Sequence, residues 1–185
     1  MTVLIAIDPS TTCTGLAVFE GDTLRQTIAV HPRKGAPKDP AEAAREIVWA
    51  SVNALADASR PPSALAEVVI EWPEVYRDSS VDANDLFVVA AVGLGIATRC
   101  TSAKLRKYKP KEWTGQIPKT TDGKLRKRDL FTNARAKRVI ARLSEAELRV
   151  FHQIETYDEL DAVGIGLHAI GRGIAQRHRV YPGAT

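Results

Sequence analysis

Apolar and polar positions in the first thirty residues form short blocks whose spacing predicts β-strands. Thr2–Ile7 is an uninterrupted apolar run rich in β-branched residues, which is typical of a buried strand. Leu16–Phe19 and Thr23–Val30 continue the pattern on either side of Gly21 and Asp22, a dipeptide that favours a hairpin turn. We therefore expect three consecutive antiparallel strands at the start of the chain.

Beyond these strands, helix and strand signals alternate. Asp39 as N-cap, followed by Pro40, predicts the start of a helix that ends before Pro61. Val68–Glu71 (VVIE) is short and wholly apolar up to its last residue, which predicts a central, parallel strand. Asp85–Arg99 is apolar on nearly every side and predicts a buried helix.

The second half of the chain carries weaker signals of the same kinds. We expect a strand over Ser102–Lys109, a loop over Lys109–Lys124, a basic helix over Lys127–Leu143, a short helix from Ser144 and a last helix from Thr156 to about Gln176. No repeat, low-complexity tract or linker interrupts this order. The sequence therefore predicts one domain over residues 1–185, an α/β fold with a mixed sheet flanked by helices.

Composition narrows the class of protein. The 185 residues are 44% hydrophobic and 26% charged, a balance typical of a globular chain long enough to bury a core. The longest apolar stretch, Leu86–Thr98, is too short to span a membrane, and the N-terminus lacks the basic start of a secretory signal. Cys13 and Cys100 form neither a disulfide framework nor a zinc ligand set. We expect a reduced, cytoplasmic protein without a membrane segment.

The net charge of +4 hides an uneven distribution. Residues 99–142 hold 15 Lys and Arg against three acids, whereas the remainder holds 11 bases against 19 acids. A basic block beside an acidic remainder is typical of a face that binds a polyanion such as nucleic acid. A solvated basic helix and loop is the alternative interpretation of the block taken alone.

Asp8 and Glu71 each come at the point where a predicted strand ends. Ligand sites gather at the carboxyl ends of strands that have parallel neighbours. Two carboxylates delivered there by adjacent strands would repel each other unless a cation lay between them. An acid that only caps the turn after its strand remains the alternative for either residue.

Asp158 and Asp161 are spaced by three residues near the start of the last helix, so they project from one face. Acids in a first turn complement the helix dipole, which is a sufficient explanation for Asp158 and for Glu159, the expected capping-box residue. Asp161 lies beyond that turn on a helix that is otherwise apolar. Burial of such an acid requires a partner, and a divalent cation is a natural one.

Four carboxylates without an evident His or Cys set favour hard cations held by oxygen, namely Mg²⁺ or Mn²⁺. Such a set typically holds two ions that hydrolyse a phosphodiester, one activating water and the other stabilising the leaving oxygen. We therefore expect Asp8, Glu71, Asp158 and Asp161 to be the catalytic residues and metal ligands of a nuclease.

Three segments of the chain also resemble one family in their order and separation. IAIDPSTTCTGLAVF, VVIEWPEVYR and YDELDAVGIGLHAIGR resemble the three motifs of RuvC-type Holliday junction resolvases. The resemblance covers almost the whole chain. It implies an RNase H-like fold with a mixed five-stranded sheet, three strands antiparallel and then two parallel, and assigns the same four carboxylates as metal ligands.

The resemblance also implies partners. A homodimer would nick two opposed strands of a four-way DNA junction, each active site using two Mg²⁺ or Mn²⁺ ions. An aromatic residue after the catalytic Glu would stack on unpaired bases, with Tyr76 as the candidate, Trp72 as the second choice, and simple packing on the loop as the alternative.

PKEWTGQIPK and the Lys/Arg-dense segment after it resemble bacteriophage members of the family, which implies action in the host cytoplasm on junctions and other branched DNA. The basic block supplies the candidate phosphate contacts. These are Lys104, Arg106, Lys107, Lys109, Lys111, Lys119, Lys124, Arg126, Lys127 and Arg128.

Three other functions compete with this hypothesis. The first motif also resembles the phosphate loop of sugar kinases and actin-like ATPases, although 185 residues leave no room for their second lobe. A catalytically silent DNA-binding module would not need four acids. A related nuclease that cuts RNA in an RNA–DNA hybrid stays open.

Overall fold

The computed structural model describes residues 2–35, 39–58, 66–74, 82–100, 104–115, 131 and 133–175. Its elements are β1 (Val3–Asp8), β2 (Thr14–Glu20), β3 (Thr23–Val30), α1 (Pro40–Ala58), β4 (Ala66–Glu71), α2 (Ala83–Ala97), β5 (Lys104–Tyr108), α3 (Pro110–Thr114), α4 (Ala134–Ile140), α5 (Glu145–Phe151) and α6 (Tyr157–Ala169). All five predicted strands are present, with ends that differ by one or two residues from the apolar runs.

The strands form one sheet in the order β3-β2-β1-β4-β5. β1, β2 and β3 pair antiparallel, whereas β4 pairs parallel with β1 and β5 pairs parallel with β4. The predicted sheet of three antiparallel and two parallel strands is therefore confirmed. β1 lies at its centre, so the strand that ends in Asp8 has neighbours on both sides.

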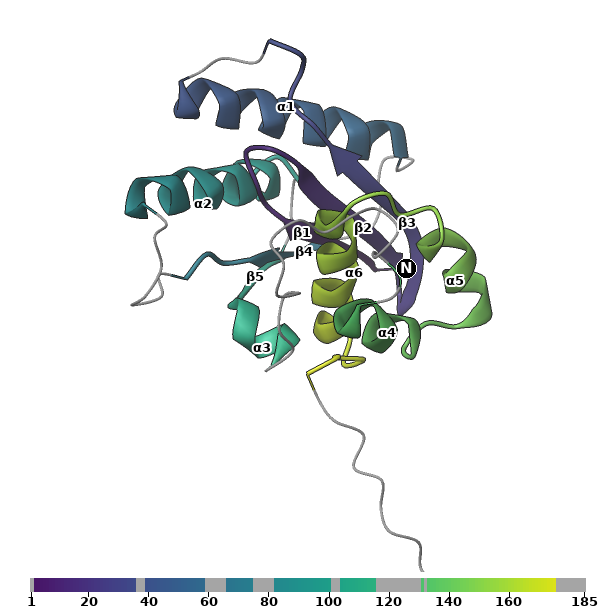
Figure 1. The fold of residues 1–185 in the computed structure, drawn as a ribbon. Coiled ribbons are helices and arrows are strands. Elements are labelled where there is room, and N and C mark those ends of the chain that lie inside the picture. The colour runs from purple at the N-terminus through teal and green to yellow at the C-terminus, as the bar shows by residue number, and fades with distance from the viewer. Residues whose placement is uncertain are drawn as a thin grey trace, which may run out of the picture.

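Helices cover both faces of this sheet (Figure 1). α1 and α2 pack together on one face, and α6 crosses the other face with α4 and α5 beside it. The alternation of side chains along β1 serves both layers, because Leu4 and Ala6 pack towards α6 while Ile5 and Ile7 pack towards α1 and α2. Burial on both faces explains why Val3–Ile7 of β1 is apolar at every position.

The structure corrects two helix predictions and one loop. The last helix ends at Ala169 rather than near Gln176, because Gly171 adopts a positive φ of 82° just beyond the helix. The helix expected over residues 127–143 covers Ala134–Ile140, with Asn133 as its N-cap; residues 127–130 and 132 lie outside the described residues. Within the stretch assigned to a loop, residues 110–114 form α3.

The apolar helix α2 is present, but it is not buried on every side. Val92, Ile96 and Ala97 are buried against the sheet and α1, whereas Phe87 is 74% exposed. Trp49 of α1 is also exposed, with the Arg99 guanidinium 5.6 Å from its ring. Within the described part of the chain, no helix combines the length and the apolar character that a membrane crossing needs.

Candidate active site

β1 and β4 deliver two carboxylates to the same edge of the sheet. The two strands run parallel with Ile7 opposite Ile70, so Asp8 and Glu71 are the next residues along each strand. Asp8 is 9% exposed and Glu71 is partly buried. The turn that follows β1 is closed by Thr14, whose hydroxyl donates to the Ser10 carbonyl at 2.9 Å and accepts from the Ser10 N–H at 3.2 Å. The predicted placement of these two acids is confirmed.

The start of α6 brings Asp158 to that edge. Gly15 is the β2 partner of Asp8, and a Cβ atom on Gly15 would lie 2.0 Å from the Asp158 carbonyl oxygen. Only glycine therefore allows this end of α6 to lie on the sheet beside Asp8. Thr156 is the N-cap of α6, and Glu159 accepts the Thr156 N–H at 3.0 Å, so the expected role of Glu159 in a capping box is confirmed.

Asp161 is buried, as the sequence predicted, and its cationic partner is a side chain. It is 3% exposed, and Nη1 of Arg135 lies 2.5 Å from both of its carboxylate oxygens. Arg135, on α4, is itself 6% exposed. The sequence led us to expect a divalent cation beside the buried Asp161, whereas the structure places the Arg135 guanidinium there. The assignment of Asp161 as a metal ligand stays a prediction.

Trp113 of α3 connects this ion pair to Glu71. Its indole N–H donates to Oε2 of Glu71 at 2.6 Å, and the Arg135 guanidinium lies 5.0 Å from its ring centroid. Trp113 is fully buried, and it fits against α6 where Gly164 leaves room, since a Cβ there would lie 2.5 Å from the ring. Glu71, Trp113, Arg135 and Asp161 thus form a continuous set of contacts, here called the Trp113–Arg135 bridge.

Cys13, immediately before β2, lies beside Asp158. Its thiol is 3.8 Å from Nε2 of His31, at the end of β3. Burial, with smaller contributions from the charge of Asp158 and a hydrogen bond to it, raises the pKa of the Cys13 thiol to about 12. Cys13 is therefore a neutral thiol at physiological pH, and it presents a weak donor towards Asp158 rather than a second negative charge.

The carboxylates fit a hard divalent cation in type and location, but not in their present arrangement. Asp8, Glu71 and Asp158 offer the oxygen donors that Mg²⁺ and Mn²⁺ prefer, at one edge of the sheet. Among the described residues, however, no three His, Cys, Asp or Glu side chains converge as a metal site would require. Asp161 shares its oxygens with Arg135.

The basic candidates on β5 and α3 differ in their surroundings. Lys104, Lys107, Lys109 and Lys111 are exposed. Arg106 is half-buried, forms an ion pair with Glu67, and donates at 3.2 Å to the Ala169 carbonyl at the end of α6. Its partners are internal, so its role in the structure is to hold the end of α6.

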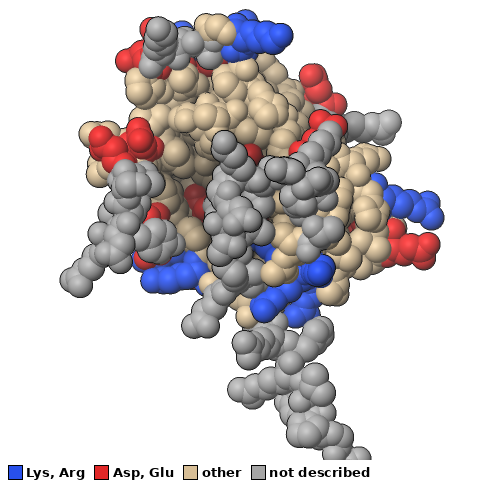
Figure 2. Space-filling model, in the orientation of Figure 1, with Lys and Arg blue, Asp and Glu red and all other residues tan. Residues whose placement is uncertain are grey.

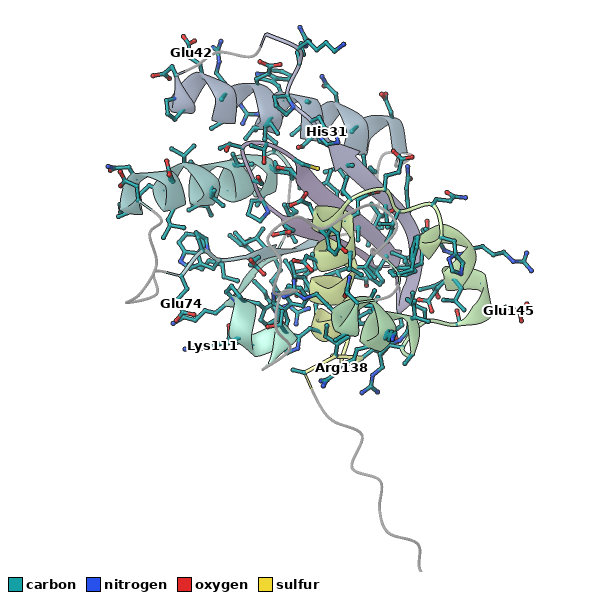
Figure 3. The ribbon with its side chains drawn as sticks, in the orientation of Figure 1. His31, Glu42, Glu74, Lys111, Arg138 and Glu145 are labelled. Carbon is teal, nitrogen blue, oxygen red and sulfur yellow. The ribbon has the colours of Figure 1, made fainter. Side chains whose placement is uncertain are left out.

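The Nζ atoms of Lys109 and Lys111 lie 3.2 and 3.3 Å from Oε1 of Glu74. Lys111 and Glu74 are labelled in Figure 3. The hydrogen bonds and charges of the two lysines hold the pKa of the Glu74 carboxyl below its usual range. Lys107 lies 4.5 Å from the centroid of the Trp72 ring. Trp72 is partly buried immediately after Glu71, where a stacking residue would be expected.

The remaining predicted contacts lie outside the described residues. They are Tyr76, Lys119, Lys124, Arg126, Lys127 and Arg128. Figure 2 shows Lys and Arg side chains along the lower edge of the face that carries α6, where Figure 3 labels Lys111 and Arg138. Some acidic atoms are set back in the middle of the same face.

Sequence reasoning missed Trp113 and Arg135 as residues of the site. Trp113 was noted only as part of PKEWTGQIPK, and Arg135 only as one of many bases in a charged segment. A tryptophan inside a polar, Pro- and Gly-containing stretch is a signal for local burial, because such a ring exposes much apolar surface if it is left in a loop. No comparable signal distinguishes Arg135 from its neighbours.

Comparison with known proteins supports the fold. No protein-family model and no curated protein matches the chain. The structure of Thermus thermophilus RuvC in complex with a Holliday junction substrate is similar, with a TM-score of 0.54 and 15% identity over 94% of this chain and 98% of that one.

A second Thermus thermophilus RuvC structure gives a TM-score of 0.52 with 18% identity, over 92% and 98% of the two chains. The nuclease domain of the large terminase subunit of bacterial virus Sf6 gives 0.36 with 19% identity, over 85% and 60%, too low to support an argument. The chain thus has the RNase H-like fold of RuvC, and that expectation is confirmed.

Proposed function

We propose that this protein is a metal-dependent endonuclease that cuts four-way DNA junctions by paired nicks. The observation that carries the proposal is the delivery of Asp8, Glu71 and Asp158 by β1, β4 and α6 to one edge of an RNase H-like sheet. Asp161 lies one turn further along α6 and completes the set of four carboxylates.

The proposed catalytic residues act by holding divalent cations. When bound, Mg²⁺ or Mn²⁺ supplies an activated water and neutralises charge on the phosphodiester. Asp8 and Glu71 are held by their strands, and the indole N–H of Trp113 fixes one oxygen of Glu71. The side chain of Asp158 is held at the first turn of α6, which rests on Gly15.

DNA would lie across the basic edge of the α6 face. Exposed lysines of β5 and α3, with the other bases predicted from the sequence, provide contacts to phosphates without reading sequence. Among the described residues, Trp72 is the proposed base-stacking residue, because it directly follows Glu71 and the Lys107 ammonium lies 4.5 Å from its ring centroid. The Thermus thermophilus RuvC structure, which holds a Holliday junction, motivates the choice of substrate.

A homodimer is part of the proposal, because two opposed strands need two active sites. α2 is the proposed contact, since Phe87 is 74% exposed and no polar or charged side chain occurs between Leu86 and Ala97. We also propose a bacteriophage-type member acting in the cytoplasm on several branched DNAs, as the PKEWTGQIPK resemblance implies.

The actin-like or sugar-kinase alternative is not favoured. The similarity to the Thermus thermophilus RuvC structure extends over 94% of this chain, which favours the nuclease over this alternative. Cleavage of RNA–DNA hybrids belongs to the same fold and is separated by experiment.

To test the proposal, the protein is incubated separately with a labelled four-way junction, a Y-fork, a plain duplex and an RNA–DNA hybrid, each with Mg²⁺, Mn²⁺ or EDTA. We expect symmetric nicks in the junction with either metal and none in EDTA. A lack of cleavage of every branched substrate with both metals would falsify the proposal. Preferred cleavage of the hybrid would favour the alternative substrate.

A further inference from the structure

The ion pair between Arg135 and Asp161 occupies a carboxylate that the proposed function assigns to metal binding. We propose that Arg135 and a divalent cation compete for Asp161, so that the protein binds one Mn²⁺ or Mg²⁺ ion without Asp161, once Asp8, Glu71 and Asp158 draw together around it, and a second ion only when Arg135 leaves Asp161. This inference rests on the proposed function, because it concerns the same carboxylates, and it adds a residue of α4 that sets their affinity for metal.

The geometry of the pair makes the competition direct. A single nitrogen, Nη1 of Arg135, lies 2.5 Å from both carboxylate oxygens of Asp161. A metal ion on Asp161 would require the same oxygens at about 2.0 to 2.6 Å and would stand where this nitrogen stands. Two positive charges at that separation in a site from which water is largely excluded would repel strongly.

Packing holds Arg135 at Asp161, but it does not give every N–H group of the guanidinium a hydrogen-bond partner among the described residues. The indole ring of Trp113 provides a platform 5.0 Å from the guanidinium carbon, and both side chains of the pair are more than nine-tenths buried. Within the described part of the chain, however, the Nε atom of Arg135 is buried without a hydrogen-bond partner. A buried guanidinium that is only partly satisfied loses less on leaving than one with all its donors paired.

The position of Arg135 in the chain is consistent with movement. It is the second residue of α4, a helix of seven residues that begins at Ala134 after its N-cap Asn133. A displacement of this short helix or a change of rotamer would withdraw the guanidinium, whereas Asp161 is fixed on the long, buried α6. Release of Arg135 therefore changes the number of oxygens open to metal without a change in the sheet.

Binding of Mn²⁺, measured by calorimetry and by the EPR signal of unbound Mn²⁺, tests the competition. We compare the wild type with Arg135→Met and with Lys137→Met, which removes one charge from the exposed side of the same helix. In Arg135→Met, the second Mn²⁺ should bind about ten-fold more tightly or better, which is about the effect of one nearby charge in a partly buried site. Lys137→Met should bind Mn²⁺ as the wild type does.

A double variant, Arg135→Met with Asp161→Asn, removes both charges and leaves no buried ion without a partner. It should fold, bind the first Mn²⁺ as the wild type does, and lose the tighter second ion. If Arg135→Met alone does not fold, Arg135→Lys replaces it, since a shorter cation should hold Asp161 less well and tighten the second ion by a smaller factor.

Three results overturn the inference: equal Mn²⁺ affinity in Arg135→Met and wild type, a gain that persists in the double variant, or two equally tight ions in the wild type. Cleavage assays on the wild type separate this failure from that of the proposed function. Junction cleavage without any change of Mn²⁺ binding in the variants rejects the competition alone. Altered binding without cleavage of any branched DNA rejects the nuclease alone.

Discussion

Two arginine–carboxylate pairs, Glu147 with Arg172 and Asp161 with Arg135, each contain a buried carboxylate, and they are built differently. The Glu147 carboxylate, 1% exposed, accepts hydrogen bonds from Nη1 and Nη2 of Arg172 at 2.8 Å. It also accepts from the Leu24 N–H at 2.9 Å and the Ser144 N–H at 2.7 Å. Asp161 meets a single nitrogen of Arg135, whose Nε atom has no partner among the described residues.

In the competition proposed above, this difference separates a pair that stabilises the fold from one that exchanges its arginine for a metal ion. Arg172 also donates to the carbonyl oxygens of Asp22 and Arg142, so the pair joins the segment that follows α6 to α5 and the β2–β3 hairpin. A charge pair saturated with hydrogen bonds rigidifies its surroundings, whereas a partly satisfied pair is the weaker structural element. We therefore expect changes near Glu147 to affect stability and changes near Asp161 to affect metal binding and activity.

The largest effect is expected for Asp8→Asn. Loss of one negative metal ligand should lower the rate of junction nicking about a thousand-fold, equivalent to about 4 kcal/mol in the barrier. Junction affinity and unfolding free energy should stay close to wild type, because the amide has the shape of the carboxylate. Gel-based cleavage and binding assays measure both, with Glu145→Gln on the surface of α5 as the control (Figure 3). Loss of junction binding in Asp8→Asn would indicate a structural role.

Glu147→Gln should have the opposite profile. Breaking a buried pair by neutralising one partner costs about 3 kcal/mol of unfolding free energy, because Arg172 and two backbone N–H groups lose a charged acceptor. Mn²⁺ affinity should not change. Urea unfolding of Glu147→Gln and Glu145→Gln, on the same helix, measures the first effect, and equal midpoints would contradict the assigned role of Glu147.

The stability of the protein at acid pH should also depend on the Glu147–Arg172 pair. The guanidinium of Arg172 and the N–H groups of Leu24 and Ser144 outweigh burial and lower the pKa of Glu147 from 4.5 to about 2. A lowered pKa in the folded state contributes stability above pH 4.5 that is lost as the pH falls towards 2. Between about pH 5 and pH 3, the wild type should lose about 2 kcal/mol more than Glu147→Gln. Parallel losses in urea unfolding series would reject this role.

The smallest of these effects is expected at the Trp113–Arg135 bridge. Trp113→Phe keeps a buried ring but removes the N–H that holds Oε2 of Glu71. We expect a cost of about 1 kcal/mol in stability and a roughly ten-fold slower nicking rate with unchanged junction affinity. Trp49→Phe, at a half-exposed ring on α1, is the matched control. A rate equal to that of the control would show that Glu71 does not need the indole.

The sheet and the acids at its edge could be predicted because their signals are local. Asp8 and Glu71 directly follow apolar runs, and such runs in parallel neighbours end at one edge. Asp161 was correctly expected to be buried, since a polar residue interrupts an apolar helix there, but the partner expected from the sequence was a divalent cation and the structure pairs it with Arg135.

The identity of that partner could not be predicted. Arg135 is one of 15 bases in residues 99–142, and its contact with Asp161 spans 26 residues of sequence. Trp113 could have been recognised as buried, but not as a neighbour of Glu71, 42 residues earlier. Contacts of this kind depend on how α3 and α4 pack on α6, which no periodicity in their short sequences specifies.

The direct contact of α6 with the sheet has a consequence for laboratory evolution of this chain. At Gly15 and at Gly164 a single added methyl group would lie 2.0 and 2.5 Å from other atoms, so alanine cannot be accommodated without moving the helix or the Trp113 ring. Glycine codons become alanine codons by one base change. In a library made by random mutagenesis, alanine substitutions at these two codons should therefore be enriched among the inactive variants. The missing Cβ atom of Gly15 sets how closely the start of α6, with Asp158, approaches Asp8.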